Sequence, residues 1–327
     1  RFGPSGPGAR PASLARLMEP PGGARERPLL ALSEDEVAAY TRLGYVLPAR
    51  RALPPEEARA LRARIEGLEA AEARPASSLF QHGHAGFPWL FDLAACRAIL
   101  DPVQDLIGPD ILVWSMSAFV KEPGSSAYVG WHQDCCYWGL APLDGIVTAW
   151  VALSDVGEES GPMEFLGGSH LGELQAQRET YHPDNLLTRG QEIEWRGPVD
   201  PERVVRATMP AGCFSLHHAK LAHASGPSRG PGRRIGLAIR YMPTRTRSEC
   251  DLETAMLVRG RDAFGHFALE RPPAALRGRE AAAQQERGIA AKQRNTLRGS
   301  DARRLAEKQR AAGGRNRPSH VLARARM

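Results

Sequence analysis

The sequence predicts a mainly β protein with flanking helices, organised around a jelly-roll or related barrel. The main observation is a series of short apolar runs separated by turns that contain Gly and Pro, which is typical of antiparallel strands joined by short loops. These runs cover residues 111–120, 128–134, 146–153, 163–166, 213–223 and 234–242. With 327 residues and 42% hydrophobic content, the chain is long enough for one large domain or two modest ones.

Two helices are expected before the first strand, and they would pack on the outside of the barrel. Ser33 and Glu36 form a capping-box pattern at the start of the first helix. The second helix would begin near Pro55, where Leu61 and Ile65 then recur at the helical period. Neither helix carries residues that point to chemistry, so we expect both to serve packing.

Composition divides the chain into three segments. Residues 1–30 are rich in Gly, Pro and Arg without hydrophobic periodicity, so we expect them to be disordered. Residues 31–270 would form the folded domain; within them, 170–206 is too long and polar for a simple hairpin and predicts a helix plus loop or an active-site lid. Residues 271–327 contain 15 Lys and Arg against 4 Asp and Glu, and we expect a basic tail that is disordered or marginally helical and lies outside the core.

The charge and the cysteines exclude several classes of protein. The net charge of +6 comes from the tail, and residues 1–270 are mildly acidic, so the chain is not expected to bind a specific nucleic acid. The five cysteines lack CxxC spacing, which excludes a disulfide scaffold and argues against a zinc ribbon. Neither a membrane span nor an apolar signal segment is present, and we expect an intracellular, cytoplasmic location.

His132 and Asp134 form a His-x-Asp pattern at the end of a predicted strand. Side chains at i and i+2 of a strand project from the same face, so both would converge on one point. One further histidine would complete a 2-His-1-carboxylate facial triad, a ligand set that suits Fe(II) oxygen chemistry. On one continuous strand His217 and His223 would lie roughly 20 Å apart, too far to bind the same ion. His223 is the better candidate, because a clear turn follows it at 224–233.

The strand that returns after this turn has one face suited to a ligand. Arg234, Gly236 and Ala238 share that face, and antiparallel pairing across the turn would place His223 beside Arg234. An arginine in such a pocket needs an anionic partner, such as a carboxylate of a small diacid. The alternative is that Arg234, which follows Arg233, is an ordinary surface arginine. The other face, which a helix is expected to cover, carries Ile235, Leu237 and Ile239.

Further motifs surround these residues in the sequence. They are FVKEPG at 119–124, WHQD at 131–134, YWGL at 137–140, VTAW at 147–150, GGSH at 167–170, DNLLTRGQE at 184–192, LHH at 216–218 and HASGP at 223–227. Together with an arginine eleven residues after His223, this set resembles the phytanoyl-CoA dioxygenase family of Fe(II)/2-oxoglutarate-dependent oxygenases. The resemblance covers roughly residues 33–270.

The resemblance implies a double-stranded β-helix, which is a cupin-like jelly roll, with iron held by His132, Asp134 and His223. Arg234 matches the arginine that pairs with the distal carboxylate of the cosubstrate 2-oxoglutarate. Gln133 and Trp150 match positions that line the cosubstrate site, and the further candidates for the same wall are Ser117 and Lys121. The implied reaction uses O2 to hydroxylate a small-molecule or acyl-thioester substrate and releases succinate and CO2. Halogenating relatives have Ala or Gly at the position of Asp134, so the carboxylate here predicts oxygen insertion or hydrogen removal instead of chlorination.

We expect several other reactive side chains to have structural or peripheral roles. Cys135 and Cys136 directly follow the aspartate, and we expect structural thiols that are open to oxidation. We do not expect His217 and His218 to be ligands, and His218 would lie nearer the pocket mouth. Three more histidines could contact substrate: His82, His84 and His170. A histidine on a solvated loop is, however, the commoner case.

Two alternative functions stay open at the level of sequence. One is a non-catalytic cupin-like barrel that binds a small acid or a protein, and the other is a basic tail that tethers the chain to nucleic acid or an anionic surface. The presence of all three predicted ligands and of Arg234 favours the enzyme, because members that have lost activity usually lose one of these four.

Overall fold

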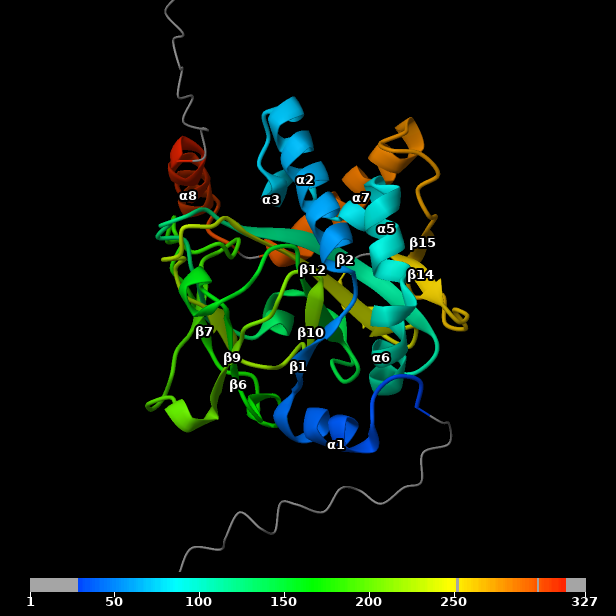
Figure 1. Cartoon of the computed structure of the whole chain (residues 1–327), viewed down its shortest axis with the longest axis horizontal. Coiled ribbons are helices and arrows are strands. Elements are labelled where there is room, and N and C mark those ends of the chain that lie inside the picture. Colours follow the sequence, from blue (N-terminus) through cyan, green and yellow to red (C-terminus); the bar gives the residue numbers. More distant parts are fainter. Residues whose placement is uncertain (1–28, 251–252, 299, 316–327) are drawn as a thin grey trace, which may run out of the picture.

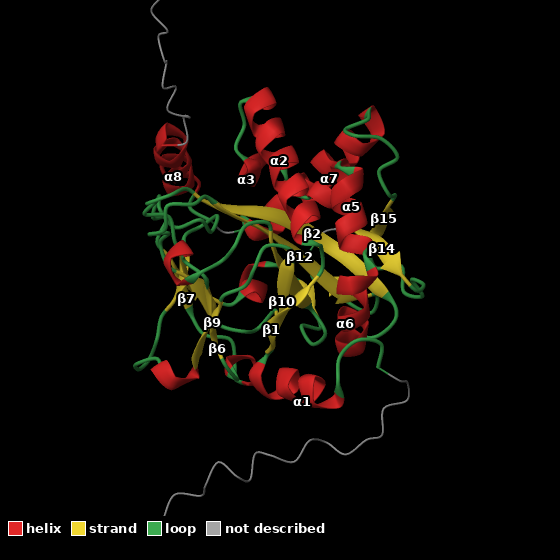
Figure 2. Ribbon diagram, in the orientation of Figure 1, coloured by secondary structure: helices red, strands yellow, loops and turns green. Residues whose placement is uncertain are grey.

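The computed structural model describes residues 29–250, 253–298 and 300–315. The predicted disordered segment 1–30 therefore lies almost entirely outside the described residues. The ribbon in Figure 1 shows a central β structure with helices around it, and Figure 2 separates the two kinds of element by colour. This arrangement confirms the mainly β fold with flanking helices.

Two large sheets form the centre of the described chain. The first is seven-stranded, in the order β1 (Tyr45–Arg51), β10 (Cys213–His218), β5 (Val147–Ala152), β12 (Arg234–Pro243), β2 (Ile111–Lys121), β14 (Thr254–Arg259) and β15 (Ala268–Glu270). The second is four-stranded, in the order β3 (Val129–His132), β11 (His223–Ser225), β6 (Met163–Leu166) and β9 (Val204–Ala207). Two short pairs complete the strands: β4 (Leu140–Ala141) with β13 (Arg247–Ser248), and β7 (Gln177–Glu179) with β8 (Gln191–Ile193).

The helices lie around this β centre. They are α1 (Glu34–Leu43), α2 (Pro55–Glu72), α3 (Ala76–Leu79), α4 (Gly83–Gly86), α5 (Pro88–Ala95), α6 (Arg97–Ile107), α7 (Arg279–Thr296) and α8 (Ala302–Arg315). In Figure 1, α2, α3, α5 and α7 gather at the upper end of the molecule, away from β6 and β9. Both predicted leading helices are confirmed, and α1 begins with the expected reciprocal hydrogen bonds between Ser33 and Glu36.

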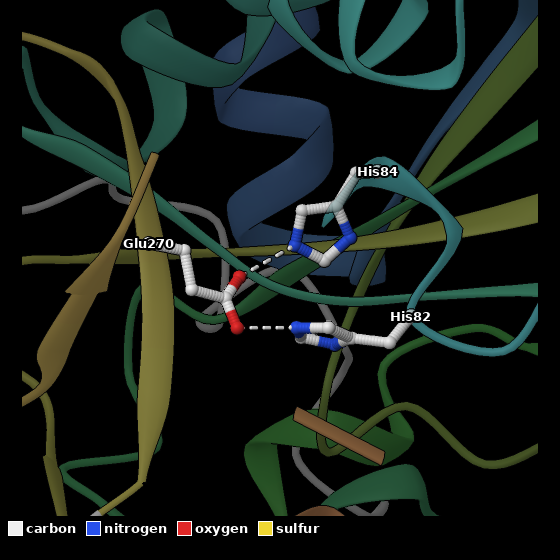
Figure 3. Close-up of side chains that lie close together, drawn as sticks. All are labelled: His82, His84 and Glu270. Carbon is white, nitrogen blue, oxygen red and sulfur yellow. Dashed lines mark hydrogen bonds and ion pairs between the residues drawn. The ribbon is translucent and has the colours of Figure 1, made fainter. Parts of the chain in front are cut away.

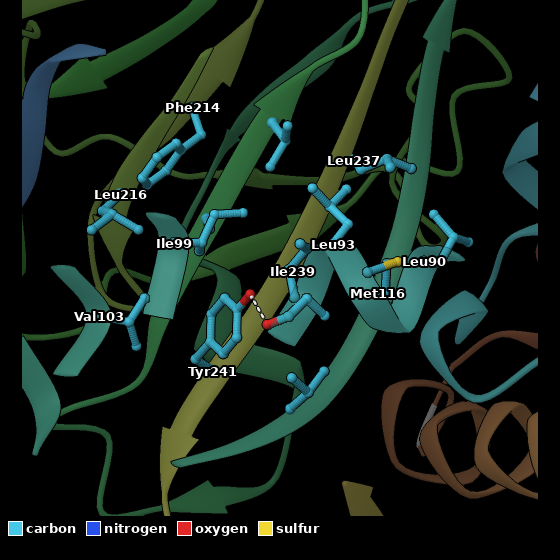
Figure 4. Close-up of a cluster of buried hydrophobic side chains, with 14 of the residues drawn as sticks. Leu90, Leu93, Ile99, Val103, Met116, Phe214, Leu216, Leu237, Ile239 and Tyr241 are labelled. Carbon is cyan, nitrogen blue, oxygen red and sulfur yellow. Dashed lines mark hydrogen bonds between the residues drawn. The ribbon is translucent and has the colours of Figure 1, made fainter. Parts of the chain in front are cut away.

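Alternation along β12 produces the two faces that the sequence predicts. Leu237 and Ile239 pack into one apolar cluster with Leu90 and Leu93 of α5 (Figure 4). Full burial of each such side chain contributes about 1.5–3 kcal/mol of free energy, so this layer fixes the helices on the sheet. The other face of β12 points toward the four-stranded sheet, where Ala238 belongs to a second cluster that lies between the sheets.

The predicted strand 213–223 is in fact two strands in different sheets, and this is a correction. β10 ends at His218, and after a connecting turn β11 begins at His223. The rings of His217 and His223 are therefore 4.7 Å apart between centroids, not the distance expected on one straight strand. β11 pairs with β3 and β6 instead of with β12, so His223 does not lie opposite Arg234 in a ladder.

The segment 170–206 forms neither an α-helix nor a plain loop. It contains the short hairpin of β7 and β8 with 3-10 turns at its ends. Its Arg189 is buried and donates hydrogen bonds to the carbonyls of Thr296, the last residue of α7, and of Arg298, both at 2.6 Å. The described part of the C-terminal segment thus holds this hairpin in place.

The expectation that residues 271–327 lie outside the core is wrong for the described part of that segment. Helix α7 spans 18 residues and packs against α4 and β14. Its buried face recurs at the helical period but is built from small and amide side chains: Ala281, Gln284, Gln285, Gly288, Ala291 and Asn295. The amide groups bond to the backbone: Gln285 Nε2 donates to the carbonyl of Gln81 at 2.8 Å. A search for large apolar residues therefore missed the packing face.

One buried ionic contact joins α7 to the core. Lys292 Nζ lies 3.5 Å from Glu253 Oε2, and the side chains of this pair are 12% and 1% exposed. Trp114 Nε1 donates to the same carboxylate at 2.5 Å, and Asn295 of α7 donates to its other oxygen. Removal of the ammonium would leave a buried carboxylate without its cation.

We predict that Lys292→Ala lowers the free energy of unfolding by about 3 kcal/mol, because breaking one side of a buried ion pair leaves the partner's charge uncompensated. For a domain of this size the loss corresponds to roughly 10 °C in Tm, measurable by thermal unfolding. Arg287→Ala, on the exposed face of the same helix, is the matched control and should leave Tm within about 2 °C. Equal Tm values for the two variants would show that α7 does not pack as described.

Among the described residues, no helix is both long enough and apolar enough to cross a membrane. All five cysteines are free thiols, which agrees with the expected absence of a disulfide scaffold.

Candidate metal and cosubstrate site

The three predicted metal ligands come together at one end of the four-stranded sheet. His132 ends β3, His223 begins β11, and the two residues lie opposite each other in the ladder with ring centroids 4.1 Å apart. Asp134 follows β3 through an extended Gln133, and its Oδ1 is 3.3 Å from His132 Nε2. One donor atom from each of the three lies within 4.8 Å of the others, which is compatible with a shared metal ion.

Backbone carbonyls orient both histidines toward this point. Nδ1 of His132 is 2.9 Å from the carbonyl oxygen of Gly130, and Nδ1 of His223 is 2.9 Å from that of Leu221. In each neutral ring Nδ1–H donates to the carbonyl, which leaves the lone pair of Nε2 as the metal-binding atom. The same i to i−2 contact in both strands fixes two of the three ligands.

The protonation states suit a divalent cation. Burial by itself would raise the pKa of Asp134, but contacts with His132 and His217 and nearby positive charge hold it well below its usual range. Burial lowers the pKa of His223 well below its usual value, and the neighbouring histidines lower it further. An ionised carboxylate and a neutral imidazole are the states in which these groups bind metal.

His217 lies closer to the site than the sequence indicated. Its Nε2 is 3.9 Å from Asp134 Oδ2, and the residue lines the same cavity as the triad. The break between β10 and β11 causes this proximity. His217 is not among the three residues whose donor atoms lie within 4.8 Å of one another.

Arg234 is buried beside the triad and is not a surface arginine. It is 3% exposed, its Nη1 donates to Ser225 Oγ at 3.1 Å, and its guanidinium lies 4.5 Å from the centroid of a Trp150 ring. Burial lowers the pKa of Arg234 to about 9, a sign of how unfavourable its charge is there. Among the described residues no carboxylate lies within 4.0 Å of it, and its buried Nε has no hydrogen-bond partner. The surface role belongs to Arg233, which pairs with Glu69 and Glu122.

Gly236 provides the space for the indole of Trp150. A Cβ on Gly236 would lie 1.9 Å from Cζ2 of that ring, so any other residue would displace it. Trp150 in turn lines the cavity and supports the guanidinium of Arg234. The prediction of one arginine with small residues on this face thus agrees with the structure, although the indole of Trp150 fills the space over Gly236.

Lys121 lies inside the site and not at its edge. The residue is 1% exposed and pairs with Arg234 across the β2–β12 ladder. Its Nζ donates to the carbonyl of Ser225 at 3.1 Å, and shorter contacts reach Ser225 Oγ and the carbonyl of Gly226. Burial and the charge of Arg234 lower the pKa of Lys121 to about 6.

Arg240 is a site residue that the sequence reasoning missed. It lines the cavity, its Nη1 donates to Ser117 Oγ at 3.1 Å, and its buried Nε has no partner among the described residues. Its charge also helps to keep Asp134 ionised. Extending the alternation of β12 by two residues beyond Ala238 would have found it.

Two candidates for the cosubstrate wall lie elsewhere. Gln133 points away from the triad: its Nε2 donates to the carbonyl of Lys220 at 2.8 Å and its Oε1 accepts from the backbone N of Gln175 at 2.8 Å. Ser117 accepts the hydrogen bond from Arg240 and lines a neighbouring cavity. Neither is among the residues that line the metal cavity.

The remaining reactive side chains lie outside the metal cavity. Cys135 is buried, and Cys136 accepts a hydrogen bond from Gln177 at 3.0 Å, as expected for structural thiols. His218 and His170 lie with ring centroids 5.2 Å apart on the wall of a separate surface cavity. His82 and His84 belong to a different buried cluster.

The cavity as a whole fits a metal bound together with a dianion. It is partly open to solvent and is lined by the triad, Arg234, Lys121 and Arg240 together with apolar residues. Two guanidinium groups with unpartnered Nε atoms leave hydrogen-bond donors available for carboxylates. The residues present therefore fit Fe(II) and 2-oxoglutarate.

A facial triad at one end of the four-stranded sheet, with a buried arginine on β12 of the seven-stranded sheet, defines the class of 2-oxoglutarate-dependent non-haem iron oxygenases. The chain belongs to the phytanoyl-CoA dioxygenase family (PhyH), whose profile matches residues 32–236. This result confirms the resemblance seen in the sequence, and the double-stranded β-helix with it.

Curated relatives have related activities. The chain is 31% identical over 165 residues to a probable alpha-ketoglutarate-dependent hypophosphite dioxygenase from Stutzerimonas stutzeri, a match that covers 49% of this chain and 55% of that protein. It is 28% identical over 239 residues to L-proline trans-4-hydroxylase from Streptomyces griseoviridis, covering 63% and 85% of the two chains. The chain thus matches about half the length of the first relative and most of the second.

Solved structures support the same assignment. The non-heme monooxygenase ThoJ in its apo form superposes with a TM-score of 0.70 at 28% sequence identity, covering 84% of this chain and 99% of that one. A carbocyclase, SnoK, shares the fold with a TM-score of 0.53 at 24% identity. None of these proteins supports the alternative of a non-catalytic binding barrel.

We predict that Arg234→Ala raises the KM for 2-oxoglutarate about 10- to 150-fold, which is the loss of a charge-assisted contact worth about 1.5–3 kcal/mol. Fe(II) binding, measured by anaerobic titration, should change little because Arg234 is not a ligand. Arg233→Ala is the matched control and should leave both values unchanged. An unaltered KM in Arg234→Ala would remove the residue from the cosubstrate site.

Asp134→Ala should weaken Fe(II) binding by about 100-fold or more, since even residues that only support a ligand contribute roughly 10–100-fold to metal affinity. Metal content after gel filtration and anaerobic Fe(II) titration measure this loss. Asp144→Ala, an exposed aspartate paired with Arg245, is the control and should retain wild-type iron content. Normal iron affinity in Asp134→Ala would show that the carboxylate is not a ligand.

Proposed function

We propose that this protein is an Fe(II)/2-oxoglutarate-dependent dioxygenase that hydroxylates a small-molecule or thioester-linked substrate. The observation that carries the proposal is the meeting of His132, Asp134 and His223 in a cavity that also holds Arg234 without a carboxylate partner. A metal-binding corner next to a buried cation suits a ligand that both chelates and carries a second negative charge.

Each residue then has a definite part. His132, Asp134 and His223 would hold the iron on one face, and when bound the iron with 2-oxoglutarate supplies the oxidising chemistry that releases succinate and CO2. Arg234 binds the distal carboxylate of the cosubstrate, while Ser225 and Trp150 keep the guanidinium in position. These contacts orient the cosubstrate before any substrate arrives.

The substrate site that we propose is a second cavity adjoining the first. The two cavities share Phe119, Asp134, Leu186, Leu187 and Arg240 in their walls. The second is larger, with about 1150 Å³ of empty space that is partly open to solvent. A substrate held there would lie next to the carboxylate side of the metal site.

The lining of this second cavity suits a substrate with both apolar and polar parts. Trp114, Tyr137 and Trp138 supply aromatic surface, while Gln191 and Gln293 supply amide groups. Helix α7 forms part of the wall, so the C-terminal segment would contribute to substrate selection. This proposal gives the described part of the basic tail a role in place of a tether.

Retention of the carboxylate at Asp134 favours hydroxylation over halogenation. Asp134 would hold the metal together with His132 and His223, and would take the position that a halide needs. The negative charge of Asp134 also offsets part of the charge of Fe(II) in a buried site. Release of a chlorinated product by the wild-type protein in the presence of chloride would overturn this assignment.

The function is tested by anaerobic titration with Fe(II) and 2-oxoglutarate, followed by a screen of metabolites and acyl thioesters for succinate release under O2. The expected result is one tight 2-oxoglutarate site that depends on Fe(II), and substrate-dependent succinate formation with a hydroxylated product. A protein that binds the cosubstrate but never consumes O2 with any substrate would favour the binding-protein alternative.

Substrate selection by α7 gives a separate prediction. Ile289→Trp should fill part of the second cavity and raise the substrate KM about 10-fold or more, since overpacking costs about 1–3 kcal/mol. Succinate formation without substrate should persist, because the metal cavity is not altered. Arg287→Trp on the exposed face of α7 is the control, and identical kinetics for the two variants would place the substrate elsewhere.

A further inference from the structure

A second cluster of metal-binding side chains lies apart from the iron triad, and one member, His82, also lines the proposed substrate cavity. His82 precedes α4, His84 lies within it, and Glu270 ends β15. Nε2 of His82 is 2.7 Å from Glu270 Oε1, and Nε2 of His84 is 3.5 Å from Glu270 Oε2. Figure 3 shows both imidazoles facing the carboxylate from one side. The three residues are 3%, 0% and 7% exposed, and none belongs to the iron triad.

The hydrogen bonds within the described chain do not satisfy these buried groups. Both ring nitrogens of His84, Nδ1 of His82 and Oε2 of Glu270 have no hydrogen-bond partner in the described residues. A buried polar group without a partner costs free energy, and such groups in a native fold call for an explanation, for example an ion. Two of these atoms, His84 Nε2 and Glu270 Oε2, face each other 3.5 Å apart beside His82 Nε2, which favours a ligand at that point.

The charge of the cluster is that of a cation site. Glu270 is the carboxylate of the cluster, and the imidazoles of His82 and His84 lie 2.7 and 3.5 Å from its two oxygens. The buried ammonium of Lys292 forms its ion pair with Glu253 at 3.5 Å, and its charge also acts on Glu270 and His82 from a greater distance. Glu270 is left as an anion facing imidazole nitrogens.

We propose that His82, His84 and Glu270 bind a zinc ion at a structural site separate from the iron site. Zinc binds sets of two imidazoles and a carboxylate, and it binds such ligands more tightly than Fe(II) does. Two ligands about 2.1 Å from one tetrahedral ion stand roughly 3.4 Å apart. The contact of His84 with Glu270 is already 3.5 Å, and that of His82 with Glu270 would lengthen from 2.7 Å to reach this spacing.

The surrounding fold holds His82 in a backbone conformation that its intrinsic preference does not explain. His82 has a φ of 53°, a left-handed conformation that is uncommon for a residue with a side chain, and its backbone N donates to the carbonyl of Met116 at 2.7 Å. Residues held in this way gather at ligand-binding sites. Gly288 of α7 lies directly on the ring, since a Cβ there would come within 2.2 Å of His82 Nε2.

The site would join three parts of the chain that are distant in sequence. His82 and His84 belong to the segment before α5, Glu270 to the edge strand β15, and Gly288 to the helix that covers them. One ion bound to the first two parts would fix the surface on which α7 packs. Because α7 lines the proposed substrate cavity, zinc would stabilise that wall without taking part in the reaction.

The test removes the iron site and asks whether zinc still binds. We would use the full chain with His132→Ala and Asp134→Ala as the background, strip its metals, and titrate Zn²⁺ while measuring bound metal by mass spectrometry. The expected result is one equivalent of zinc and a rise in Tm on binding. Adding Glu270→Gln to this background should weaken zinc binding at least 100-fold, whereas adding His266→Ala, a nearby histidine outside the cluster, should not.

A spectroscopic measurement covers the case in which a cluster variant fails to fold. Co²⁺ bound to the unmutated cluster in the same background should give the visible absorption of a tetrahedral site, and X-ray absorption of bound zinc should show nitrogen and oxygen neighbours without sulfur. A folded background protein that binds no zinc would show that the three residues form only a hydrogen-bonded clamp. Sulfur ligands would place the zinc at cysteines and also overturn the proposal. Neither result would affect the iron-dependent function, which is measured on the wild-type chain.

Discussion

The pairing of strand β11 with β3 is the interaction on which the site depends. It places His223 directly opposite His132, and pairing with β6 on the other side holds β11 within the sheet. At the other end of this three-residue strand, Ser225 accepts hydrogen bonds from Arg234 and Lys121. One short ladder therefore aligns the metal-binding end of the cavity with its anion-binding end. Displacement of β11 would therefore disrupt both metal binding and anion binding.

Local alternation explains why much of the site could be predicted from the sequence. His132 and Asp134 share a face because Gln133 between them is extended, and the same alternation turns Gln133 away. Arg234 was found because its strand neighbours on that face are small. The division of 213–223 into two sheets depends on long-range pairing of β10 with β5 and of β11 with β6, and no local pattern records it. The predicted separation of His217 from His223 was therefore wrong.

Helix α7 shows a different limit of sequence reasoning. Hydrophobic periodicity finds helices that pack through Leu, Ile and Val, and α7 has few of these. Its contacts are made by amides: Gln284 receives a hydrogen bond from the backbone N of Arg271 and donates to the carbonyl of the same residue, at 2.9 and 2.8 Å. Such a face has the composition of a solvated helix and becomes recognisable only when its partner backbone is known. Arg279, Arg287 and Arg294 of α7 are exposed, and their charge obscured the buried side chains of the same helix.

The two buried clusters carry opposite charge imbalances, and this contrast explains what each binds. Beside the triad, Arg234 and Arg240 exceed the single carboxylate of Asp134, and burial depresses the pKa of both arginines because their charges lack full compensation. A dianion that binds there supplies the missing charge, so binding energy is available for the cosubstrate before any contact with substrate is made. At the second cluster Glu270 is the anion, and the imidazole nitrogens that face it can bind a cation in the tautomer that carries the proton on Nδ1. The same cost of burying charge therefore selects an acidic cosubstrate at one point in the fold and a metal cation at the other.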